Sequence, residues 1–171
     1  MPFIEERTTE YLIDIHTHIA PNVDDGSKSM EMSLAMLRSE AEQGAKVVFL
    51  TPHSSAFGGA WTAHTLKRMQ EVQETAVKEG LPVQICRGCE IYTNRQRIEE
   101  ILRELKDGIL PSMNGTRYIL AEFSVHRGNM DDAKYCLRRY LEEGWIPIIA
   151  HAERYCRTFA TVETVPWGRI S

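Results

Sequence analysis

Short apolar runs alternate with longer amphipathic stretches along most of the chain. Five runs rich in apolar and β-branched residues predict strands, and they cover residues 11–16, 47–50, 83–92, 118–123 and 146–151. Between them, apolar residues recur at helical spacing over residues 29–43, 63–78, 95–105 and 131–143. Such βα units, each about thirty residues long, predict an α/β protein with a parallel sheet or barrel.

The composition is that of an ordinary globular domain with one core. The chain has 171 residues, of which 43% are hydrophobic and 26% are charged. A formal net charge of −4 gives no electrostatic support for binding nucleic acid. The sequence has no apolar run of membrane-spanning length and no signal-peptide segment at its start. We therefore expect a cytoplasmic protein, without membrane insertion and without a nucleic-acid partner.

Cys86 and Cys89 match the C-x-x-C pattern of redox and zinc sites. They lie within a strand-like run, however, and not at a helix N-terminus, where a thiolate would be stabilised. The chain has no second C-x-x-C to complete a four-thiolate zinc site. We expect that these two residues, like Cys136 and Cys156, serve packing.

Residues of metal-ligand type occur at the end of every predicted strand. In chain order they are His16 and His18, His53, Glu90, Glu122, and His151. The carboxyl ends of parallel strands meet on one side of a sheet, so we expect these side chains to converge. A single histidine of this kind is more often a core or solvated residue than a ligand. The ordered set favours ligands.

The first of these strand ends carries two histidines and is followed by two aspartates. His16 and His18 are two residues apart on an extended segment, so both imidazoles point to one side and can hold one ion. Asp24 and Asp25 follow in the same loop. One carboxylate can reach the site, and the other can cap the helix that begins near Ser29. A turn without a functional role is the alternative for this segment.

Imidazole and carboxylate ligands together suit Mn, Fe, Zn or Mg. Glu90, on the central strand, is the natural bridge between two ions, and ions about 4 Å apart generate a hydroxide nucleophile and neutralise phosphoryl charge. Arg154 lies close enough to His151 to bind phosphate oxygens, with an ion pair to Glu153 as the alternative. No motif for covalent catalysis or for nucleotide binding occurs. The pattern indicates a metal-dependent phosphoesterase.

Residues 14–26, DIHTHIAPNVDDG, resemble the opening of the polymerase-and-histidinol-phosphatase (PHP) superfamily. More narrowly, the chain resembles the bacterial manganese-dependent protein-tyrosine phosphatases that regulate capsule and exopolysaccharide synthesis. Four later motifs of that subfamily follow in order, namely TPH at 51–53, GCEIY at 88–92, LAEFS at 120–124 and IAHAERY at 149–155. The last motif separates the chain from the histidinol-phosphatase branch.

The resemblance implies a distorted (β/α)7 TIM-like barrel, here incomplete, with about five βα units in residues 1–155. It also implies up to three ions, most readily Mn. The first ion would be held by His16 and His18, the second by Glu122 and His151 with Glu90 as the bridge, and the third by Asp25 and His53. Arg154 would contact the phosphate. The implied substrate is phosphotyrosine in the tail of a bacterial tyrosine kinase.

The end of the sequence departs from the family pattern. Relatives of full barrel length end with an Asp-x-His motif that supplies further ligands, whereas residues 156–171 contain none and predict an irregular tail. We therefore expect fewer ions, together with open apolar strand edges that favour pairing with another chain or a homo-oligomer. Two alternatives remain at this point. One is a weak or inactive fragment that only binds metal, and the other is a small-molecule phosphoesterase such as a histidinol phosphatase.

Overall fold

The computed structural model describes residues 11–54, 63–124 and 130–155. Strands and helices alternate in the order β1 (Leu12–Thr17), α1 (Met30–Glu42), β2 (Ala45–Leu50), α2 (Ala63–Lys78), β3 (Gln84–Arg87), β4 (Glu90–Tyr92), α3 (Ile98–Lys106), β5 (Tyr118–Glu122), α4 (Met130–Glu142) and β6 (Ile146–Ile149). Short 3-10 helices, η2 (Met113–Gly115) and η3 (Ala152–Tyr155), complete the described part. The α/β class is confirmed. The predicted tail at 156–171 lies outside the described residues.

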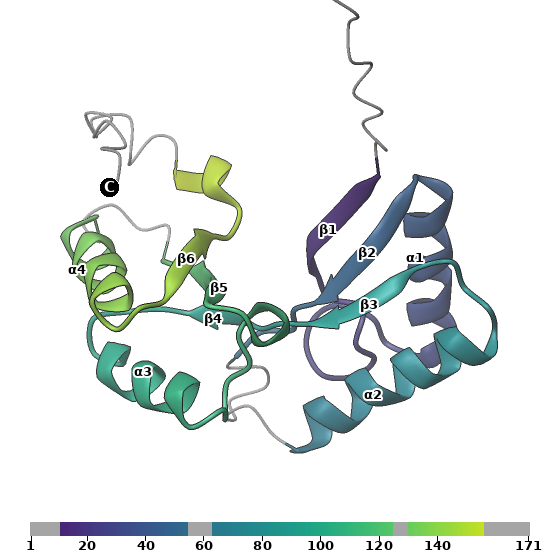
Figure 1. The fold of residues 1–171 in the computed structure, drawn as a ribbon, viewed down its shortest axis with the longest axis horizontal. Helices are drawn as coiled ribbons and strands as arrows, with labels where there is room; N and C mark the ends of the chain where they lie inside the picture. The colour runs from purple at the N-terminus through teal and green to yellow at the C-terminus, as the bar shows by residue number, and fades with distance from the viewer. Residues whose placement is uncertain (1–10, 55–62, 125–129, 156–171) are drawn as a thin grey trace, which may run out of the picture.

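The strands form two parallel sheets, ordered β1-β2-β3 and β4-β5-β6 (Figure 1). The prediction of one strand over residues 83–92 is wrong, because β3 and β4 belong to different sheets. Gly88 lies at the break between them. A Cβ atom there would come within 2.7 Å of the Met113 sulfur and 2.9 Å of Thr51 Cγ2, so only glycine allows η2 and the end of β2 to approach so closely.

The segment that follows β2 joins the two sheets. His53 forms an isolated parallel bridge with Glu90. Its neighbours complete the link, because the amide of Glu90 donates to the Pro52 carbonyl at 3.1 Å and the amide of Ser54 donates to the Glu90 carbonyl at 2.8 Å. The sheets therefore meet where β2 ends and β4 begins.

Helices cover the outer face of both sheets. In Figure 1, α1 and α2 lie beside the first sheet, and α3 and α4 lie beside the second. The main core forms between helices and strands, and its fully buried members include Leu37, Val48, Leu50, Met69, Ile91, Ile101, Ile119 and Tyr140. Cys89 and Cys136 belong to this core, and Cys86 is also buried. All three are free thiols, which confirms the packing role for them, while Cys156 lies outside the described residues.

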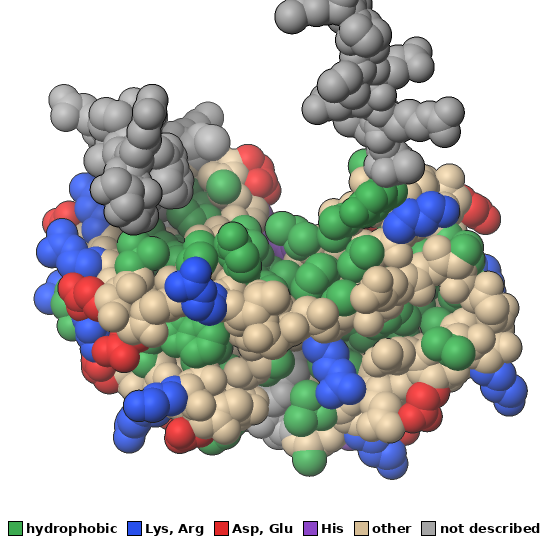
Figure 2. Space-filling model, viewed as in Figure 1, with side chains coloured by type: hydrophobic (Ala, Val, Ile, Leu, Met, Phe, Trp, Pro, Cys, Tyr) green, Lys and Arg blue, Asp and Glu red, His purple; other side chains and the backbone are tan. Residues whose placement is uncertain are grey.

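The other face is apolar and only partly covered. Met113, Leu120 and Ala150 form a small second cluster there, packed against Phe49 and Ile148. The side chains of Leu12, Ile13 and Ile15 on β1 are exposed, as is that of Tyr11 directly before it. Figure 2 shows hydrophobic side chains of this kind beside a hollow between the sheets. The expectation of an apolar edge is confirmed for β1. Among the described helices, none has the length and apolar character needed to cross a membrane.

Candidate metal centre

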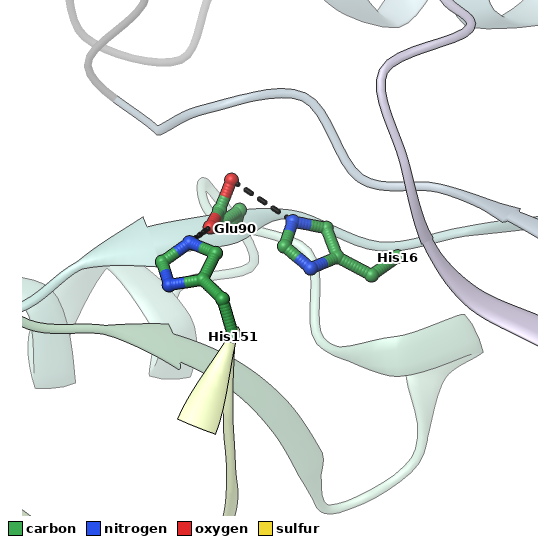
Figure 3. Close-up of side chains that lie close together, drawn as sticks. All are labelled: His16, Glu90 and His151. Atoms are coloured by element: carbon green, nitrogen blue, oxygen red, sulfur yellow. Dashed lines mark hydrogen bonds and ion pairs between the residues drawn. The ribbon is translucent and has the colours of Figure 1, made fainter. Parts of the chain in front are cut away.

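Side chains from four strand ends surround the carboxylate of Glu90, the first residue of β4. His16 comes from β1, and His151 lies two residues after Ile149, the last residue of β6. Figure 3 shows both imidazoles pointing at the Glu90 carboxylate, one toward each of its oxygens. Glu90 itself is fully buried, although it is a charged residue. The predicted convergence of strand-end ligands is therefore present in the structure.

The two carboxylate oxygens of Glu90 have different surroundings. Oε2 lies 3.1 Å from one nitrogen of each of three imidazoles, those of His16, His18 and His53. Oε1 lies 2.7 Å from Nε2 of His151. Oε2 is nevertheless buried without a hydrogen-bond partner. Such an orphaned acceptor is costly unless a cation neutralises it.

Electrostatics keep this carboxylate ionised. Burial raises the pKa of Glu90, but the close approach of His16 and His18 and electrostatic attraction from His16 and His53 outweigh it and hold the pKa well below the ordinary value. Burial likewise lowers the pKa of His18, yet contacts with Asp24 and Glu90 raise it to about 10. In the metal-free protein the negative charges of Asp24 and Glu90 therefore favour a proton on His18.

Three further groups line the rim of the cluster. Glu122 lies 3.6 Å from both His53 Nδ1 and His151 Nε2, and burial together with the charge of Glu90 raises its pKa. Asp25 Oδ1 lies 3.7 Å from His53 Nε2, with 83% of the Asp25 side chain exposed. Arg154 is exposed in η3, and its positive charge offsets part of the rise in the pKa of Glu122. In the described chain, Arg154 makes no ion pair with Glu153.

The donor set fits divalent metal ions. Ligand atoms lie within 4.8 Å of one another in three groups, namely His16 with Glu90 and His151, His18 with His53 and Glu90, and His18 with Asp24 and Asp25. Nitrogen and oxygen donors of this kind suit Mn, Fe or Zn. Glu90 belongs to two of the groups, as expected of a bridge. His16 and His18, which the resemblance assigns to one ion, also lie together, with their Nε2 atoms 3.3 Å apart.

Asp24 is a site residue whose role the sequence left open. Its buried carboxylate accepts hydrogen bonds from His18 Nδ1 at 2.7 Å and from the amides of Gly26 and His53 at 2.9 and 3.2 Å. The expected capping role is wrong for both aspartates, because Ser29 itself caps α1 by accepting from the amide of Met32. The contact between Asp24 and the amide of His53 joins residues that are far apart in the sequence, so no local sequence pattern predicts it.

Hydrogen bonds between threonines fix the ends of β1 and β2. The amide of Thr17 donates to Thr51 Oγ1 at 2.9 Å, and the amide of Thr51 donates to the Thr17 carbonyl at 2.9 Å. Both residues are buried. This pair sets the spacing between His16 and His18 on one strand end and His53 on the other.

The segment after β6 is held in a strained conformation. His151 has a φ of +35°, in the left-handed region that non-glycine residues rarely adopt. Four residues later, the Tyr155 hydroxyl donates to the Phe123 carbonyl at 2.7 Å and accepts from the Phe123 amide at 3.0 Å. These bonds fix η3 to the end of β5. They therefore hold His151 next to Glu122.

Comparison with known proteins places this arrangement in a family. The family model described as "Capsular polysaccharide synthesis, CpsB/CapC" matches residues 12–166. The chain belongs to this family. It is 35% identical over 147 residues to the tyrosine-protein phosphatase CpsB of Streptococcus pneumoniae, and the match covers 84% of this chain and 58% of that protein. It is 31% identical over 154 residues to the tyrosine-protein phosphatase YwqE of Bacillus subtilis, covering 84% of this chain and 55% of that protein.

A solved structure of the same CpsB/CapC type shares the fold. It belongs to a study of YwqE from Bacillus subtilis and CpsB from Streptococcus pneumoniae, described as metal-dependent tyrosine phosphatases. The match has a TM-score of 0.75 at 30% identity and covers 86% of this chain and 59% of that chain. The chain thus spans a little under three fifths of the length of these CpsB/CapC relatives.

Proposed function

We propose that the protein hydrolyses phosphotyrosine in a protein substrate, using divalent metal ions held by the Glu90 cluster. The observation that carries the proposal is the buried Oε2 atom of Glu90, which has no hydrogen-bond partner and lies 3.1 Å from three imidazoles. Metal-dependent phosphatases among the relatives support the same chemistry. Manganese is the proposed ion, in line with the nitrogen and oxygen donors.

The metal-binding residues have distinct proposed roles. Glu90 would bridge two ions, and the remaining ligands would be His16, His18, Asp25, His53, Glu122 and His151. When bound, divalent ions lower the pKa of water and neutralise charge on a phosphoryl group. The buried cluster orients the imidazoles before any ion binds, because each nitrogen already faces Glu90. This preorganisation lowers the cost of assembling the site.

Arg154 is the proposed phosphate-binding residue. It is exposed at the rim next to Glu122, and its guanidinium makes no ion pair with the adjacent Glu153 in the described structure. A planar guanidinium with several donors can bind two phosphate oxygens at once. Arg154 would thereby position the phosphoryl group over the cluster.

The surroundings of the site favour a substrate on a protein surface. Tyr92 and Ser124 lie two residues after Glu90 and Glu122 in the sequence, and they line a cavity of about 220 Å³. The exposed side chain of Asp25 shows that the rim is open to solvent on another side. An open site of this kind can accept a phosphotyrosine side chain on a polypeptide, such as the tail of a bacterial tyrosine kinase. We further propose that the two sheets form part of an incomplete (β/α) barrel.

Hydrolysis assays with metal control test the proposal. Protein treated with chelator and reloaded with Mn²⁺ should hydrolyse p-nitrophenyl phosphate and a phosphotyrosine peptide. His16→Ala should lose most of this turnover, while Lys46→Ala, which is exposed on β2, serves as the matched control. Turnover that persists without metal, or that is unchanged by His16→Ala, contradicts the mechanism.

Two measurements separate the remaining alternatives. A higher rate on histidinol phosphate than on the phosphotyrosine peptide would assign the protein to small-molecule phosphoesterases. Metal bound in the protein without turnover on any ester would leave only a metal-binding role. Metal analysis of the same sample should accompany the assay, because it distinguishes loss of bound metal from loss of turnover. The chain spans 58% of CpsB from Streptococcus pneumoniae.

A further inference from the structure

Asp24 is a buried carboxylate whose two oxygens are both engaged. Oδ2 accepts from His18 Nδ1 at 2.7 Å and from the His53 amide at 3.2 Å, and Oδ1 accepts from the Gly26 amide at 2.9 Å. The residue is 2% exposed. A charge this deeply buried needs partners for both oxygens, and Asp24 has them.

The contact with His18 determines how that imidazole faces the cluster. Nδ1 of His18 faces Asp24, and Nε2 on the far edge of the ring lies 3.1 Å from Glu90 Oε2. When Nδ1 carries the proton and donates to Asp24, Nε2 has a free lone pair directed toward the cluster. A carboxylate behind a ligating histidine fixes the tautomer and the ring orientation, and it makes the ligand more basic.

Asp24 also connects two histidines from different strand ends. His18 follows β1, whereas His53 follows β2, and the same oxygen of Asp24 accepts from the His18 ring and from the His53 backbone. His18, His53 and Glu90 form one of the groups that can hold an ion. One carboxylate therefore sets the spacing of two of the three side chains in that group.

We propose that Asp24 is a positioning residue that fixes His18 in its Nδ1-protonated form and holds His53 beside it, so that both are ready to bind one ion. The inference deepens the proposed function and rests on the metal centre assigned there. Direct ligation by Asp24 is the competing role, since its carboxylate also lies near His18 and Asp25. Against it, both oxygens of Asp24 are already occupied by N–H donors.

Metal titration without substrate separates these roles. Asp24→Asn keeps an oxygen that accepts from the His18 ring, and Asp24→Ala removes it. Asp107→Asn, at the exposed end of α3, is the matched control. We expect all variants to bind as many ions as the wild type. Mn²⁺ affinity should fall by about 10- to 100-fold in Asp24→Ala, by a smaller factor in Asp24→Asn, and not at all in the control.

A spectroscopic measurement reports the tautomer directly. In wild-type protein loaded with Zn²⁺, which is diamagnetic, the ¹⁵N shifts of His18 should show a protonated Nδ1 and a ligating Nε2. In Asp24→Ala the His18 Nδ1 shift should change because its N–H loses the carboxylate acceptor, or Nδ1 should replace Nε2 as the ligating atom. The shifts of His151, which Asp24 does not contact, should stay the same. Far-UV circular dichroism establishes that each variant is folded, and Asp24→Asn serves if Asp24→Ala does not fold.

Two results would overturn the proposal. Loss of one bound ion in Asp24→Asn would make Asp24 a ligand, and unchanged Mn²⁺ affinity in a folded Asp24→Ala protein would leave it without a role at the site. Neither measurement depends on phosphate ester hydrolysis. Failure of the phosphatase assay with normal metal binding would therefore contradict the proposed function and leave the role of Asp24 intact.

Discussion

Nε2 of His151 lies 2.7 Å from Oε1 of Glu90, although 61 residues separate the two in sequence. His151 reaches this position with a backbone φ of +35°. A strained conformation persists only where its surroundings hold it, and strained residues are concentrated at functional sites. This contact, made by a residue in a strained conformation, therefore supports a functional role for the pair of Glu90 and His151.

Glu90→Gln should abolish metal binding and reduce turnover by at least about 100-fold, because a neutral amide cannot bridge two cations or balance their charge. Metal analysis after dialysis, together with phosphotyrosine peptide hydrolysis, measures both effects. Glu104→Gln, a half-buried glutamate in α3, is the matched control. A Glu90→Gln protein that retains wild-type metal content would show that Glu90 is not the bridge.

Arg154→Ala should raise KM for a phosphotyrosine peptide by about 10-fold or more without changing the bound metal, because Arg154 lies at the rim and is proposed to contact phosphate. Arg154→Lys should recover only part of the loss, since an ammonium cannot bind two oxygens in the planar geometry of guanidinium. Steady-state kinetics on the same peptide provide the measurement. Equal KM values in wild type and Arg154→Ala would remove the assigned role.

Metal affinity should increase with pH. In the metal-free protein, burial lowers the pKa of His18, but Asp24 and Glu90 raise it to about 10, compared with 6.5 ordinarily. The imidazole is therefore protonated at neutral pH, and an incoming ion must displace that proton. Affinity should rise by up to about tenfold per pH unit between about pH 6.5 and 8.5. Calorimetry in buffers of different ionisation enthalpy should detect the released proton, and binding without proton release would contradict the prediction.

Gly26→Ala should destabilise the metal-free protein by about 2–4 kcal/mol. A Cβ atom at Gly26 would come within 2.1 Å of the His18 carbonyl oxygen and 2.4 Å of the His18 Cβ, and backbone atoms cannot move aside cheaply. Gly44→Ala is the control, because nothing lies within 4 Å of its Cβ position. Its positive φ of +95° should cost only about 1 kcal/mol. Urea unfolding of both variants gives the comparison.

The sequence predicted the elements and their order because apolar periodicity is a local property. Helix and strand positions agree with the structure to within a few residues, apart from the strand predicted over residues 83–92. That break depends on Met113 and Thr51, which approach Gly88 from distant parts of the chain. No window of sequence around Gly88 contains this information.

The candidate site was predictable to the extent that strand ends fix where side chains gather. Glu90 and His151 follow that rule, and the structure brings them together. Residue pattern alone does not distinguish the burial of Asp24 from that of Asp25, because adjacent residues of one turn differ in burial only after the chain has folded. Asp24 is buried, and 83% of the Asp25 side chain is exposed.

The bridge between His53 and Glu90 is the point where the two sheets meet, and the proposed metal ligands come from both of them. An ion bound there would link the two sheets through side chains from both. At a free concentration 100 times its dissociation constant, it would add about 2.7 kcal/mol against any opening in which the site is lost. Amide hydrogen exchange along β1 and β6 should therefore slow together when metal is added, although these strands lie at opposite edges of the described fold.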